Sequence, residues 1–184
     1  MKILHMKSVK RFYVKFFNGF CLEKEEIFFD EYIDKEDTCI VGFSYGAQKA
    51  LEYVYQSDKR IDKLILLSPA FFQREKPSFI RTQLHYFEVN QDAYIENFLA
   101  NVSYPSQYDL SKYLHIGSNE ELNALLSYQW DKNKIEEILN RETSIEVFLG
   151  DKDKIIDVAS AKLFFIQTTT YIIKDAGHLL KGNE

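Results

Sequence analysis

Five short apolar runs alternate with helix-like segments, and this alternation constrains the fold more than any other feature of the sequence. The runs, most of which stop at a turn residue, cover residues 12–17, 38–41, 63–67, 145–149 and, more weakly, 169–173. Most are apolar on both faces, as the central strands of a parallel sheet must be. Helical spacing of apolar residues predicts helices over 23–32, 47–55 and 158–165. Strands alternating with helices predict an α/β protein with a mostly parallel, doubly wound sheet.

The stretch between the third and fourth runs has a different character. It contains no convincing strand, and its apolar spacing predicts helices over 77–87, 92–100, 119–130 and 132–140. A wholly helical insertion of this length is too long for an ordinary crossover. We therefore expect residues 70–143 to form a helical cap over the carboxyl edge of the sheet, where α/β proteins bind ligands. The core would then comprise 10–69 and 144–184, with 1–9 as a leader.

The second run leads into the motif Gly42-Phe43-Ser44-Tyr45-Gly46, and a predicted helix follows it. A G-x-S-x-G motif between a strand and a helix is the pattern of a nucleophile elbow. The glycines suit a turn too tight for a Cβ atom, and the helix N-terminus favours a developing anion. The motif therefore predicts Ser44 as a catalytic nucleophile.

A nucleophilic serine needs a base and an acid that orients the base. In folds with such an elbow the chain order is serine, acid, histidine, and of the four histidines only His178 follows the last predicted strand. The acid should follow the strand that ends at residue 149. We expect Asp153 in this role, with Asp151 as the alternative, whereas Asp157 is better placed to cap the next helix.

The transition state of such a reaction also needs two backbone N–H donors for its oxyanion. One should come from Tyr45, directly after the nucleophile. The other should come from the turn after the first strand, Asn18-Gly19-Phe20-Cys21, and we expect the N–H of Phe20 to supply it. The sequence therefore predicts a complete set of groups for acyl transfer.

Composition excludes several other functions. The net charge of −5 opposes general nucleic-acid binding, which needs a basic face.

Cys21 and Cys39 fit no metal-ligand spacing and suit buried, reduced thiols, so we expect no metal, no cofactor and a cytoplasmic protein. No apolar run is long enough to span a membrane, and the N-terminus is too interrupted by lysine and histidine for a signal peptide.

From Phe16 to Leu180 the sequence resembles the short, BioV-type pimeloyl-acyl-carrier-protein methyl ester esterases of bacterial biotin synthesis, which are α/β hydrolases. The resemblance runs through the segments 17–20, 42–47, 67–69, 145–150 and 177–180. The elbow and the triad are common to all α/β hydrolases. The compact length, the Asn-Gly-Phe turn and the cap pattern around Arg81 narrow the resemblance to the short esterases.

This resemblance implies hydrolysis of the methyl ester of a pimeloyl chain carried on acyl carrier protein, with release of methanol. Ser44 would attack, His178 would act as base and then as acid, and Asp153 would orient it. Arg74, Lys76 and Arg81 could dock the acidic carrier and its phosphopantetheine arm, although a solvated helix face explains them equally well. The trimmed fold leaves few elements to bury the sheet edge, which a homodimer would cover.

Two other functions remain open at this point. A generic carboxylesterase or acyl-thioesterase would use the same triad without preferring a carrier-bound substrate. A hydrolase fold without activity could serve as a binding module, but the presence of all three triad residues opposes that reading.

Overall fold

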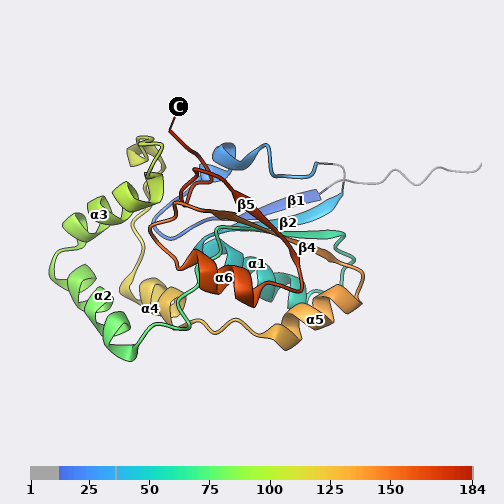
Figure 1. Cartoon of the computed structure of the whole chain (residues 1–184). Helices are drawn as coiled ribbons and strands as arrows, with labels where there is room; N and C mark the ends of the chain where they lie inside the picture. Colours follow the sequence, from blue (N-terminus) through green and yellow to red (C-terminus); the bar gives the residue numbers. More distant parts are fainter. Residues whose placement is uncertain (1–12, 36, 184) are drawn as a thin grey trace, which may run out of the picture.

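The computed structural model describes residues 13–35 and 37–183, and within them the chain forms one parallel sheet (Figure 1). The predicted leader, residues 1–9, lies outside the described residues. The sheet has five strands in the order β1-β2-β3-β4-β5, and all neighbours are parallel. The strands are β1 (Tyr13–Phe17), β2 (Thr38–Phe43), β3 (Lys63–Leu67), β4 (Ser144–Gly150) and β5 (Thr169–Ile173). All five predicted strands are confirmed, as is the α/β class.

The sheet is parallel and is flanked by chain segments on both faces, which agrees with the expected doubly wound architecture. The helices that lead directly into β3, β4 and β5 share one face, because right-handed crossovers between strands in chain order place them there. These helices are α1 (Tyr45–Gln56), α5 (Lys132–Asn140) and α6 (Val158–Phe164), which lie together below the sheet in Figure 1. Their apolar side chains pack on alternate residues of the strands, such as Leu64, Leu66 and Val147.

The opposite face of the sheet is covered by the segment between β1 and β2, together with residues further along the chain such as Val102. The 3₁₀ helix η1 (Glu25–Phe29) places Phe29 against the other set of strand residues, which includes Val41 and Ile65. Leu179 and Leu180, from the end of the chain, complete this second layer. We predicted an α-helix over 23–32, but the segment begins with Lys24 at a φ of 60° and makes only a short 3₁₀ turn.

Besides α5, the segment predicted as the cap contains α2 (Pro77–Val89), α3 (Gln91–Ser103) and α4 (Asn119–Ser127), with a short turn η2 (Ser111–Tyr113) between the last two. Helix α2 packs against α3 and α4, whereas α5 packs against α1 and β4. Helix α5, at the end of the predicted segment 70–143, is the crossover helix that leads into β4. The expected helix 119–130 stops at Ser127, because the backbone of Tyr128 is extended and Trp130 bonds elsewhere.

Candidate active site

Ser44 occupies a sharp turn between β2 and α1. Its φ of 53° and ψ of −112° lie in a region that a serine adopts only under strain, at a cost of about 1–3 kcal/mol. The turn is held from the sheet, since the N–H of Ser44 donates to the carbonyl of Leu67 at 2.9 Å. Strain of this kind is typical of a nucleophile elbow, where it lifts the hydroxyl clear of the sheet.

Both glycines of the motif are required by close backbone contacts. A Cβ atom on Gly42 would lie 2.3 Å from the carbonyl oxygen of Gly46. A Cβ atom on Gly46 would lie 1.9 Å from the carbonyl oxygen of Phe17, at the end of β1. The start of α1 is therefore pressed against the turn that follows β1, which brings Tyr45 and that turn to the same place.

Ser44, His178 and Asp153 form a continuous chain of hydrogen bonds. His178 Nε2 lies 2.9 Å from Ser44 Oγ, and His178 Nδ1 lies 2.6 Å from Asp153 Oδ2. With the proton on Nδ1, the imidazole donates to the carboxylate, and Nε2 is free to accept the proton of the serine hydroxyl. All three groups are shielded from water: Ser44 is 2% exposed, His178 is 0% exposed, and the Asp153 side chain is 0% exposed.

The structure also separates the three aspartates that follow β4. Asp153 Oδ1 accepts hydrogen bonds from the N–H groups of Ile155 at 2.7 Å and Ile156 at 3.3 Å, so one oxygen fixes the loop while the other faces the imidazole. Asp151 is exposed. Asp157 caps α6 through the N–H groups of Ala159 and Ser160, as the sequence predicted. Of the three aspartates, Asp153 is therefore the one placed to orient His178.

A further group, which was not expected from the sequence, holds the histidine in place. Ser68 is fully buried, has a φ of 41°, and donates its hydroxyl to the carbonyl oxygen of His178 at 2.6 Å. It lies directly after β3, where the sequence shows only an ordinary Ser-Pro turn. Nothing in that pattern reveals a partner 110 residues further along the chain.

The two expected oxyanion donors lie on either side of the elbow. Tyr45 is the first residue of α1, where N–H groups have no acceptor within the helix. Phe20 is buried in the turn after β1, which contacts the elbow through the carbonyl groups of Phe17 and Asn18. Glu25 holds this turn in place, because its Oε1 accepts a hydrogen bond from the N–H of Gly19.

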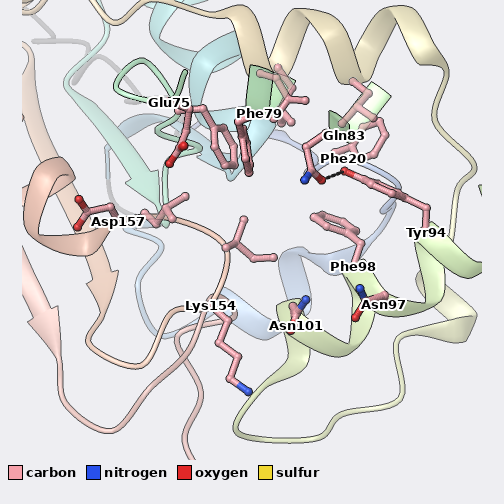
Figure 2. Close-up of a pocket in the computed structure, with 16 residues that line it drawn as sticks. Phe20, Glu75, Phe79, Gln83, Tyr94, Asn97, Phe98, Asn101, Lys154 and Asp157 are labelled. Atoms are coloured by element: carbon pink, nitrogen blue, oxygen red, sulfur yellow. Dashed lines mark hydrogen bonds between the residues drawn. The ribbon is translucent and has the colours of Figure 1, made fainter. Parts of the chain in front are cut away.

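A cavity of about 440 Å³ lies between the cap and the segment that follows Asp153 (Figure 2). Phe20, from the turn after β1, and Ile155 and Ile156, from the loop after Asp153, line one part of it, whereas Ser44, Asp153 and His178 are not among its lining residues. Most of its remaining apolar wall comes from the predicted cap: Phe72, Phe79, Phe98, Leu122, Leu125 and Leu126. An aliphatic acyl chain fits such a wall, because both are apolar.

The cavity also has a polar side, visible in Figure 2. Tyr94 donates a hydrogen bond to Gln83 Oε1 at 2.9 Å, and burial raises the pKa of Tyr94 to about 12, so its hydroxyl stays protonated. The other polar residues that line the cavity are Glu75, Asn97, Asn101, Lys154 and Asp157. The lining therefore combines an apolar interior with hydrogen-bonding groups and charges of both signs.

The three cations expected to dock a carrier are not equivalent. Arg74 donates to Ser160 Oγ at 3.2 Å, and that hydroxyl in turn donates to Asp157 at 2.6 Å. The hydrogen bonds from Ser160, with a smaller contribution from the charge of Arg74, lower the pKa of Asp157. Lys76 and Arg81 are exposed at the start of α2 and, among the described residues, form no ion pair. None of the three is among the residues that line the cavity in the described structure.

No group of three or more histidine, cysteine, aspartate or glutamate side chains in 13–35 and 37–183 could hold a metal ion. In the same residues, no helix has both the length and the apolar character to cross a membrane.

No protein-family model matches the sequence, and no curated protein matches it. Solved structures do match. The α/β hydrolase MGS-M2 from a Medee basin deep-sea metagenome library is similar over 94% of this chain and 84% of its own, with a TM-score of 0.64 and 13% identity. MenH from S. aureus is similar over 90% of this chain and 85% of its own, with a TM-score of 0.59 and 15% identity.

A third structure, the carboxylesterase CesB from Bacillus subtilis, covers 94% of this chain and 79% of its own, with a TM-score of 0.58 and 13% identity. At these identities the likeness concerns the fold. The parallel sheet, the strained serine turn and the matching structures agree, and the chain has the α/β-hydrolase fold.

Proposed function

We propose that this protein is a serine carboxylesterase and that its substrate is the methyl ester of a pimeloyl chain on acyl carrier protein. The observation that carries the first part is the hydrogen-bond chain from Ser44 through His178 to Asp153, with distances of 2.9 and 2.6 Å. The second part rests on the sequence resemblance and on the apolar cavity, whose lining includes the residues directly after Asp153.

In the proposed reaction Ser44 Oγ attacks the ester carbonyl while His178 takes its proton. The N–H groups of Phe20 and Tyr45 stabilise the negative charge that develops on the carbonyl oxygen. His178 then gives the proton to the departing methanol, which leaves the acyl group on the serine. A water molecule, deprotonated by the same histidine, releases the acid and restores the enzyme.

A generic carboxylesterase or acyl-thioesterase is the second candidate, and a specific observation favours it. Arg74, which is adjacent in sequence to the cavity residue Glu75, donates a hydrogen bond to Ser160 and interacts with the charge of Asp157. Glu75 and Asp157 also line the cavity, and both would repel an acidic carrier. Carrier docking would then depend on Lys76 and Arg81 alone.

Turnover of two substrates separates these candidates. The wild type and Ser44→Ala are assayed with methyl-pimeloyl carrier protein and with a small nitrophenyl ester. We expect the wild type to release methanol from the carrier-bound ester and the variant to be inactive on both. Cleavage of the small ester alone would leave a generic esterase. If neither substrate is cleaved by folded wild type, the esterase proposal is wrong.

A further inference from the structure

The structure buries one carboxyl group that the triad does not use. Glu25 is the first residue of η1, and its side chain has no exposed surface. Its Oε1 accepts a hydrogen bond from the N–H of Gly19 at 2.6 Å, whereas its Oε2 has no hydrogen-bond partner in the described part of the chain. Burying a half-satisfied carboxyl group is costly, so its position calls for an explanation.

The contacts of Gly19 supply that explanation. A Cβ atom on Gly19 would lie 2.8 Å from the ring of Phe43 and 3.7 Å from Glu25 Oε1, so the turn is enclosed by both side chains. Phe43 directly precedes the nucleophile, and its ring contacts the His178 imidazole, with 5.1 Å between centroids. The next residue after Gly19 is Phe20, whose N–H is the second proposed oxyanion donor.

We propose that Glu25 is a positioning residue for the oxyanion hole. By accepting from Gly19, its carboxyl group fixes the turn after β1 and thereby the direction of the Phe20 N–H. Phe43 limits the same turn from the other side. This inference rests on the proposed function, in which the N–H of Phe20 binds the oxyanion.

The protonation state of Glu25 should make its effect on the oxyanion hole depend on pH. Burial, assisted by the charges of Glu26 and Glu23, raises the pKa of Glu25 to about 7, and the hydrogen bond from Gly19 only partly opposes this. The turn and the end of β2 that pack against it contribute Gly19 and Phe43, which carry no charge. Below this pH a neutral acid holds the turn. Above it, a carboxylate places negative charge beside the developing oxyanion and slows the reaction.

The rate at which a fluorophosphonate modifies Ser44 tests this, because that reaction uses the same nucleophile and the same oxyanion hole. Glu25→Gln keeps an oxygen acceptor and cannot ionise, Glu25→Leu removes the acceptor, and Asp30→Asn is an exposed control at the end of the same 3₁₀ helix. We expect Glu25→Leu to react roughly 10- to 100-fold more slowly than wild type, less than the loss of an entire oxyanion donor. The ratio of the Glu25→Gln rate to the wild-type rate should rise as the pH passes through about 7.

A wild-type rate in folded Glu25→Leu would overturn the inference. So would a Glu25→Gln to wild-type ratio that stays constant with pH, which is the result for a purely structural side chain. If Glu25→Leu does not fold, the pH dependence of that ratio still decides. A folded wild type that the reagent does not modify would instead overturn the proposed function, and the inference with it.

Discussion

The triad and the cap are built on different principles. Around the triad, backbone meets backbone so closely that side chains are excluded: a Cβ atom on Gly150 would lie 2.2 Å from the carbonyl oxygen of Gly177, directly before His178. The cap instead surrounds a cavity of about 440 Å³ with side chains. In the proposed esterase, close backbone contacts would therefore fix much of the catalytic geometry, whereas the choice of substrate would depend on cap side chains that can be replaced without disturbing it.

Hydrogen bonds are among the contacts that join the two regions. Gln48, buried in α1, donates from Nε2 to the carbonyl oxygens of Ala70 and Leu125, both at 3.0 Å. The helix that begins at the elbow is thereby bonded to α4 of the cap. From this difference between the triad region and the cap, we expect variants of the triad to lose hydrolytic activity on all substrates. Variants of the cap surface should change only the preference among substrates.

The largest effect should come from the nucleophile and the base. Ser44→Ala or His178→Ala should each lower kcat by about 10⁶-fold, and the double variant should lose little more, because the triad acts as a unit. Steady-state kinetics with a nitrophenyl ester measure this. If the loss of kcat in the double variant equalled the product of the losses in the two single variants, the residues would act independently, which would contradict a shared proton-transfer chain.

The next effect concerns the acid. Asp153→Asn should lower kcat by roughly 10⁴-fold, because an amide cannot stabilise the imidazolium and favours the wrong tautomer. Asp151→Asn is the matched control, and as a surface change it should stay within about twofold of wild type. The same assay decides, and a severe loss in Asp151→Asn with a mild one in Asp153→Asn would exchange their roles.

Glu25 should affect stability in a pH-dependent way. Its pKa is raised in the folded state, from an ordinary value of 4.5 to about 7, so the unfolded chain releases the proton first as the pH rises. The stabilisation is complete below about pH 4.5 and is lost as the pH rises to about 7. Since one pKa unit corresponds to about 1.4 kcal/mol, the loss amounts to about 3 kcal/mol.

Denaturant unfolding of wild type and Glu25→Gln across this pH range measures the effect. The free energy of unfolding of wild type should fall relative to that of Glu25→Gln between about pH 4.5 and 7. A constant difference between the two proteins would show that Glu25 is not protonated in the folded state near neutral pH.

The smallest effect should come from the cap surface. Arg81→Glu should raise KM for a carrier-bound ester by about tenfold, which corresponds to about 1.4 kcal/mol, and leave a small ester unaffected. Lys112→Glu, an exposed change of the same charge on η2, controls for the effect of net charge. Equal losses on both substrates would make Arg81 a structural residue.

The sequence predicts the local elements and the triad more completely than it predicts the packing. Each strand is a continuous apolar run, and the elbow has glycines at fixed spacing, so local patterns suffice. Which face of the sheet each helix covers depends on the strand order, which a single sequence does not display.

Long-range contacts account for the rest. Ser68 and Glu25 act on groups that the sequence pattern around them does not reveal. The helix expected to reach Trp130 ends at Ser127, because the indole N–H bonds to the carbonyl of Ala70 and the backbone N–H to Gln73. In both cases tertiary hydrogen bonds override or extend what local propensity indicates.

The central claim is that Ser44 is the nucleophile, and the most direct test is to locate a covalent adduct. Folded wild type is treated with a fluorophosphonate, digested, and analysed by mass spectrometry of its peptides, with Ser44→Ala treated in parallel. The account predicts one modified peptide, with the added mass on Ser44, and no modification in the variant. An unmodified Ser44 in folded wild type, or an adduct on another residue that persists in the variant, would contradict it.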